Sequence, residues 1–144
     1  MIHALGQDSN FAFLKEAMDV ASNRHQVITS NIANIDTPGY KARDMDFNGY
    51  MKDFESMQEH DQAVRVSNAR EGATPIYETT SLLNYKDYEI DQPSDFLKQR
   101  FDGNNVDLDK EMGKMATNQG RFKLAVQFMN RKFRLIGDTL NSSK

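Results

Sequence analysis

The chain has 144 residues, a length that suits one domain, and 38% of them are apolar. This fraction is below the roughly 45–50% of an ordinary globular domain, so the hydrophobic core must be thin or confined to part of the chain. A formal net charge of −3 argues against nucleic-acid binding, which normally needs a basic surface, and the lack of cysteine excludes disulfides, thiolate metal sites and cysteine nucleophiles.

The first twenty residues lack the basic segment and long apolar run of a cleaved secretory signal. No stretch approaches the roughly 18 consecutive apolar residues that a membrane-spanning helix requires. We therefore expect no direct membrane insertion. The protein should stay in the cytosol or leave it by a route that uses no cleaved signal.

Residues 9–35 are predicted to form a long amphipathic helix, because apolar residues recur at alternating steps of three and four. The packing seam of this helix is Phe11, Leu14, Met18, Ala21, His25, Ile28, Ile32 and Ile35. We interpret His25, its one polar member, as a core residue and not as a ligand.

A sharp turn is predicted directly after this helix, at Thr37-Pro38-Gly39-Tyr40. Proline at the second and glycine at the third position favour a type II turn. The side chains of the two asparagines just before it, Asn31 and Asn34, can satisfy carbonyls in the last helical turn. The helix should therefore end at a defined residue, and the chain should leave it in a fixed direction.

The middle of the chain is predicted to be largely irregular, with a short helix over residues 46–58. Short apolar groups at Val64–Val66, Ile76–Tyr77 and Leu82–Leu83 could form brief strands.

The pattern D-x-D-x-N-G-x5-E from Asp44 to Glu55 fits a calcium-binding loop. Such a loop needs a helix entering directly before it, and Pro38-Gly39 stands in that place. We therefore expect Asp46 to cap the short helix, and calcium binding remains an alternative.

Residues 107–141 carry a second stripe with the same alternation of four and three. Its members are Leu108, Met112, Met115, Gln119, Phe122, Val126, Met129, Phe133, Ile136 and Leu140. Asp102-Gly103-Asn104-Asn105 supplies turn and capping residues before this helix. Acidic residues near its start and basic residues toward its end suit the helix dipole.

These patterns predict a mainly α fold in which the N- and C-terminal helices pair as an antiparallel coiled-coil hairpin. The single domain divides into the first helix (1–36), an irregular connecting segment (37–104) and the last helix (105–144). Apolar residues outside both stripes, such as Phe13, Val20 and Phe128, need a further packing surface. No catalytic, cofactor or metal residues are expected, because the histidines are far apart and no phosphate-binding or nucleophile motif occurs.

Two segments of the chain resemble a known family. The segment N-I-A-N-I-D-T-P-G-Y resembles the N-terminal signature of flagellar axial proteins. The matching residues are Asn31, Ala33, Asn34, Thr37, Pro38, Gly39 and Tyr40. The following K-A-R-D-M-D-F and the later D-Q-P-S…D-G-N-N-V-D-L-D, with extra residues between its two parts, narrow the resemblance to the small basal-body rod subunits of the proximal rod.

This resemblance implies a structural subunit that polymerises into the proximal rod, surrounds the export channel and transmits torque. Its implied partners are copies of itself, other rod subunits, the ring–rod junction protein, the membrane-embedded ring and the flagellar type III export apparatus. The implied location is the periplasmic part of the basal body, reached without a cleaved signal peptide. An export adaptor or chaperone built as a helical hairpin remains the second interpretation.

Overall fold

The fold of the chain, seen in a computed structural model that describes residues 9–71, 83–91 and 100–142, is mainly helical. Its helices and strands, in chain order, are α2 (Ser9–Ala33), β1 (Arg43–Met45), α3 (Phe47–Glu71), the 3-10 helix η1 (Tyr85–Tyr88), β2 (Glu89–Asp91) and α4 (Leu108–Ser142). None of the described helices is both long and apolar enough to cross a lipid bilayer.

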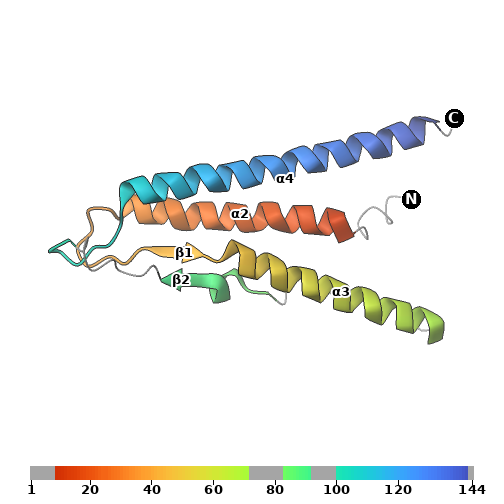
Figure 1. Ribbon diagram of the computed structural model, residues 1–144, viewed down its shortest axis with the longest axis horizontal. Helices are drawn as coiled ribbons and strands as arrows, with labels where there is room; N and C mark the ends of the chain where they lie inside the picture. The colour runs from red at the N-terminus through yellow and green to blue at the C-terminus, as the bar shows by residue number, and fades with distance from the viewer. Residues whose placement is uncertain (1–8, 72–82, 92–99, 143–144) are drawn as a thin grey trace.

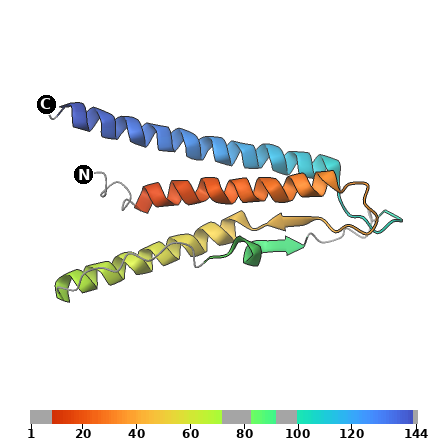
Figure 2. The same cartoon turned by 180° about the vertical axis from the view of Figure 1, so that it is seen from behind.

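Helices α2 and α4 run antiparallel and contact each other extensively, which confirms the predicted hairpin. Helix α2 is the middle layer of the molecule, with α4 on one side and the α3–sheet layer on the other (Figures 1 and 2). The start of α2 and the end of α4 point to the same, open end of this hairpin, where α4 extends beyond α2 (Figure 1). The segments that follow α2 and precede α4 lie at the closed end.

The middle segment differs from its prediction. Helix α3 runs to Glu71, well beyond the predicted end at residue 58, so the strand suggested at Val64–Val66 is wrong. The strands lie elsewhere, since β1 and β2 pair antiparallel with Asp44 opposite Ile90. Residues 76, 77 and 82 lie outside the described residues, and Leu83 is not in a strand.

A second face of α2 packs against the α3–sheet layer. Val20 on α2 is fully buried in a cluster with Met45, Tyr50 and Met51, and Phe13 packs against that cluster. This contact accounts for Phe13 and Val20, two apolar residues of α2 that lie outside its predicted stripe. Helix α2 is therefore covered on two sides, and burial of both faces stabilises its position in the molecule.

Three tyrosines hold the sheet and η1 against α2 and α3. The Tyr50 ring stacks on Tyr85 at 5.1 Å between centroids and meets Tyr88 edge-on at 5.0 Å. The hydroxyls of Tyr50 and Tyr85 both donate to Oε1 of Glu16 on α2, at 2.6 and 3.0 Å. Tyr88 donates to the Asp53 carboxylate at 2.7 Å. Since η1 has no buried residue, these polar and aromatic contacts are what hold it in place.

These contacts predict an alkaline limit to stability. Burial, followed by the Glu16 carboxylate, raises the pKa of Tyr85 to about 12, and burial raises the pKa of Tyr50 further. Because the folded-state pKa lies above the ordinary value of 10.0, their stabilising effect is complete below pH 10 and is lost as the pH rises through the folded-state pKa. We expect phenolate absorbance and helical circular dichroism to show late tyrosine ionisation coupled to loss of helix.

The variant Glu16→Gln should bring part of this phenolate absorbance down toward pH 10, because the carboxylate beside Tyr85 is removed. Glu55→Gln is the matched control, since it makes the same change at an exposed carboxyl of α3. Ionisation of all tyrosines together near pH 10 in the native protein would contradict the proposed burial.

Candidate functional site: the polar junction and the exposed faces of the last helix

The turn after α2 has the conformation that its sequence predicts. Gly39 has a φ of +73°, and the Tyr40 amide donates to the Thr37 carbonyl at 3.3 Å. Positive φ at the third position together with this hydrogen bond defines a type II turn. Glycine is required there because a side chain would be strained at this φ.

The end of α2 is capped from the second signature segment. Asn104 is fully buried, and its Nδ2 donates to the carbonyls of Asn34, Ile35 and Thr37 at 2.9, 3.0 and 2.9 Å. Asn34 donates to the Ser30 carbonyl at 2.8 Å, as predicted. The carbonyls left open where the helix stops are thus satisfied by a residue about 70 positions further along the chain.

The loops on either side of this cap are hydrogen-bonded to each other. The Gly39 amide donates to the Asp102 carbonyl at 2.8 Å, and Lys41 Nζ donates to the Gly103 carbonyl at 2.7 Å. The Ala42 amide donates to the Asn105 side chain at 2.6 Å. The described parts of the two signature segments, residues 39–42 and 102–105, therefore form one structural unit at the closed end of the hairpin.

Asn31 has a different role from the predicted one. Its Nδ2 donates to the Arg43 carbonyl at 2.6 Å and to Glu111 Oε2 at 2.9 Å. Its Oδ1 accepts from the Arg43 amide at 3.1 Å and from the Tyr40 hydroxyl at 3.2 Å. The prediction that Asn31 caps α2 is wrong, because this buried side chain instead joins α2 to β1 and α4.

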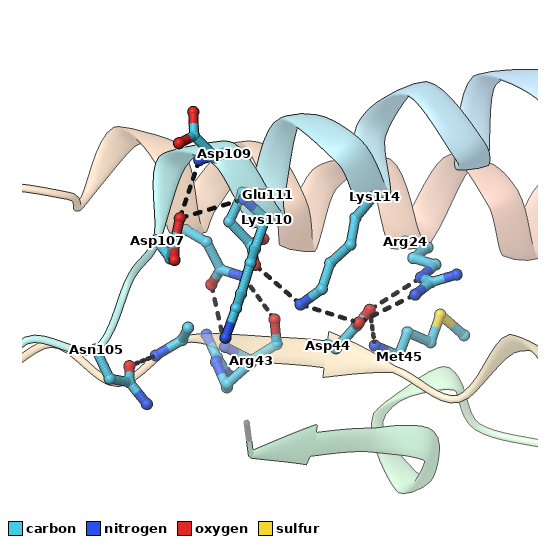
Figure 3. A network of polar contacts seen from close by, with 12 residues as sticks. Arg24, Arg43, Asp44, Met45, Asn105, Asp107, Asp109, Lys110, Glu111 and Lys114 are labelled. Carbon is cyan, nitrogen blue, oxygen red and sulfur yellow. Dashed lines mark hydrogen bonds and ion pairs between the residues drawn. The ribbon is translucent and has the colours of Figure 1, made fainter. Parts of the chain in front are cut away.

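Charged side chains continue this contact along the hairpin (Figure 3). Arg24 on α2 donates to both oxygens of Asp44, at 2.9 and 3.0 Å. Lys114 on α4 lies 3.3 Å from Asp44 and 2.9 Å from Glu111, which is 1% exposed. We call Arg24, Asn31, Asp44, Glu111 and Lys114 the polar junction.

The structure does not support the calcium-loop alternative. Residues from Phe47 to Glu55 are helical, and Asp44 is held by Arg24, so the loop geometry that would gather their oxygens is not formed. Asp46 caps α3 as predicted, accepting from the Gly49 amide at 3.0 Å. Within the described ranges, no three histidine or acidic side chains converge where they could hold a metal ion.

The stripe predicted on α4 is only partly buried in the hairpin. The residues of α4 that are buried are Glu111, Asn118, Ala125 and Met129. Met115, Val126 and Ile136 are half-buried, whereas Leu108, Met112, Phe122 and Phe133 are 42–57% exposed and Gln119 is also exposed. Within one chain, the predicted stripe of α4 is therefore not a continuous buried seam. On α2 the predicted stripe, His25 included, is buried or half-buried.

A second exposed apolar group lies on the other side of the buried line of α4. It consists of Leu124, Phe128 and Leu135, each more than half exposed. Phe122 and Leu124 are two positions apart, so they point roughly 160° away from each other at about 100° per residue. Two apolar flanks thus lie on either side of the α2 contact: flank A is Leu108, Met112, Phe122, Phe133 and Leu140, and flank B is Leu124, Phe128 and Leu135.

Comparison with known proteins identifies the family to which the chain is similar. Residues 12–41 match the family described as flagella basal body rod protein. A flagellar basal body rod protein FlgB from Escherichia coli strain K12 is 32% identical over 141 residues, which cover 94% of this chain and 95% of that protein.

The chain belongs to the FlgB family of flagellar basal body rod proteins.

The FlgB of Bacillus subtilis strain 168 is 35% identical over 131 residues, covering 91% of this chain and 92% of the relative. The FlgB of Salmonella typhimurium is 31% identical over 121 residues, covering 83% of each chain. Membership of this family confirms the resemblance and makes the chain a structural rod subunit of the flagellar basal body. The export-adaptor interpretation gains no support.

The charged members of the polar junction were not singled out from the sequence as one site. Arg24, Asp44 and Lys114 are separated by 20 and 70 positions, and each is an ordinary surface residue type. One local signal existed on α4, because Glu111 and Asn118 are seven positions apart and therefore lie on the same side of the helix. Because Glu111 and Asn118 are polar, a search for apolar periodicity does not select them.

Replacing Asn104 with aspartate should destabilise the closed end of the hairpin. Asn104→Asp keeps the shape but places a carboxylate against three carbonyls that have lost their donor. We expect the free energy of unfolding of the full chain in urea to fall by about 3 kcal/mol, the upper end for buried groups left without a partner. Asn48→Asp, the same change at an exposed position of α3, should leave it nearly unchanged. Equal effects of the two variants would show that Asn104 does not hold the end of α2.

Acid should weaken the polar junction. Burial by itself would raise the pKa of Asp44. This effect is outweighed by hydrogen bonds from Arg24 and the Met45 amide and by the positive charges of Arg24 and Lys114. Together they hold the pKa of Asp44 below its ordinary value of 3.8. Because the folded-state pKa is the lower one, this stabilisation is present above pH 3.8 and is lost as the pH falls through the folded-state pKa.

The variant Asp44→Asn should therefore be less stable at neutral pH and less sensitive to acid, measured by urea unfolding across the pH range. Asp109→Asn, which changes an exposed carboxyl on α4, is the control. Parallel pH profiles for the native protein and Asp44→Asn would contradict a stabilising Asp44 carboxylate.

Proposed function

We propose that this chain is a proximal-rod subunit that polymerises around the export channel as part of the shaft that transmits torque. The observation that carries this proposal is the pair of apolar flanks on α4. Eight large apolar side chains are between 42 and 59% exposed along one helix. An exposed apolar surface of this extent is typical of an interaction site.

The arrangement of the flanks favours lateral assembly over a simple dimer. Each flank lies on its own side of the α2 contact, so α4 can contact two neighbouring subunits at once. Contacts between different faces of identical subunits generate rings or helical polymers. A shaft built from such subunits would bury both flanks and leave the remaining polar face of α4 in contact with water.

The closed end of the hairpin supports the same function. The turn at Gly39, the cap from Asn104 and the polar junction fix the direction in which β1 and α3 leave α2. In a polymer this direction is repeated in every subunit. We infer that the sheet and α3 make the outer lateral contacts, while α2 and α4 form the inner core.

The partners and route follow from this role. We infer contacts with copies of this chain, other rod subunits, the ring–rod junction protein and the membrane-embedded ring. The subunit would leave the cytoplasm through the flagellar type III export apparatus, without a cleaved signal peptide, and assemble in the periplasm. It would have no catalytic activity, because its role is mechanical.

Charge placed on flank B should block assembly without unfolding the subunit. Phe128→Asp puts a carboxylate where we infer a buried contact between subunits, and an unpaired buried charge is very costly. Phe128 is exposed within one chain, so the helical circular dichroism of the purified variant should be unchanged. We expect cells carrying this variant to be non-motile, and mass spectrometry should not find it in purified basal bodies.

The matched control is Gln127→Asp, which adds the same charge at the neighbouring exposed position outside the flank. It should be incorporated and should support swimming. Normal swimming with Phe128→Asp, or an equal defect with Gln127→Asp, would show that flank B is not an assembly surface.

A further inference from the structure

Helix α4 does not turn its most apolar side toward α2. The predicted stripe has apolar residues at nine of ten positions, with Gln119 as the exception. The residues buried against the rest of the chain instead centre on Glu111, Asn118 and Ala125. At about 100° per residue, the buried line is rotated by roughly 60° from the centre of the apolar stripe.

Burial of apolar area alone does not explain this rotation, since it would favour turning Met112 and Phe122 inward. The two lines meet only toward the C-terminal end, where Met129 belongs to both. This convergence follows from a seven-residue repeat drifting by about 20° per heptad on a straight helix. Some other interaction must hold the first half of α4 in its observed orientation.

Asn118 makes a contact that depends on this orientation. It is 2% exposed, and its Nδ2 donates to the backbone carbonyl of Ala21 in the middle of α2 at 2.7 Å. The small Ala21 side chain allows the amide to reach the helix backbone there. Neighbouring stripe positions on α2 carry the larger Met18, His25 and Ile28, which would hinder the same approach.

Glu111 makes the second such contact. It lies one heptad before Asn118, on the same side of α4, and accepts from the Asn31 side chain at 2.9 Å. Turning α4 to bury its apolar stripe would move both polar side chains away from their partners on α2. Asn118 stabilises the fold less than a fully bonded amide would, because its Oδ1 has no hydrogen-bond partner among the described residues.

We propose that Asn118, together with Glu111, is a positioning residue that sets the rotation of α4 about its own axis. Flank A meets α2 at Phe133, whose ring lies edge-on to Phe11 at 5.6 Å between centroids. The rotation keeps the rest of flank A outside the intramolecular contact and leaves one apolar flank on each side of α2. Without these contacts, α4 would turn flank A and Gln119 inward, and the subunit would present flank B alone. The consequence for assembly rests on the proposed function, whereas the rotation itself does not.

Thiol labelling can measure this rotation, because the chain has no cysteine of its own. Gln119→Cys reports the side of α4 that would turn inward, and Leu124→Cys reports the opposite side. Both positions are exposed, so both thiols should react rapidly with a maleimide in the otherwise native full chain. In the Asn118→Ala background, we expect labelling at position 119 to slow several-fold while labelling at position 124 stays fast.

The two reporters separate rotation from unfolding. Rapid labelling of both with native helical circular dichroism would show that α4 keeps its orientation without Asn118, and the proposal would be overturned. Rapid labelling of both with loss of helix would also overturn it, since Asn118 would then support the fold in general. Thr117→Ala, an exposed neighbour of Asn118, is the control and should change neither rate.

Motility tests the consequence for the polymer. Cells with Asn118→Ala should fail to swim although the protein remains helical. If labelling shows the rotation and the cells still swim, the role of flank A in assembly fails while the positioning role of Asn118 stands. If labelling shows no rotation, the positioning role fails whatever the motility result.

Discussion

The buried hydrogen bonds between Asn31, Arg43 and Glu111 determine how the rest of the molecule is arranged. A single amide joins the end of α2, the start of β1 and the start of α4, and all of its hydrogen-bonding groups are used. Burying a charged group such as Glu111 is unfavourable unless it is fully bonded. Such a contact tolerates few alternative geometries, so it favours one arrangement of the three segments over others that would bury similar apolar area.

The two sides of the hairpin differ in how completely they are packed. Helix α2 is covered by α4 on one side and by the Tyr50 cluster on the other, so its apolar residues have partners within the chain. Helix α4 contacts α2 along one line and keeps two apolar flanks exposed. This asymmetry lets one helix fix the internal structure of a subunit while the other remains available for contacts between subunits.

The sequence predicted those elements whose signals are local or periodic. The seam of α2, the type II turn at Gly39 and the Asp46 cap depend on residue types at short spacing, and the structure has all three. The full length of α3 was missed because its apolar pattern is weak beyond residue 58. The polar junction was missed because Arg24, Asp44 and Lys114 meet only after folding, and a single sequence contains no signal for such distant pairs.

The predicted orientation of α4 is also wrong because it depends on contacts that form only after folding. Periodicity identifies the most apolar side of a helix, but that side faces inward only if intramolecular burial is the dominant requirement. In a subunit that must also pack against neighbours, part of the apolar surface belongs to contacts outside the chain. A few buried polar contacts can then decide how that surface is divided, because an amide or carboxylate loses more by losing its partner than a methyl group loses by partial exposure. The half-exposed residues of α4, such as Met112 and Phe122, are therefore informative about assembly because they depart from the pattern expected for an isolated hairpin.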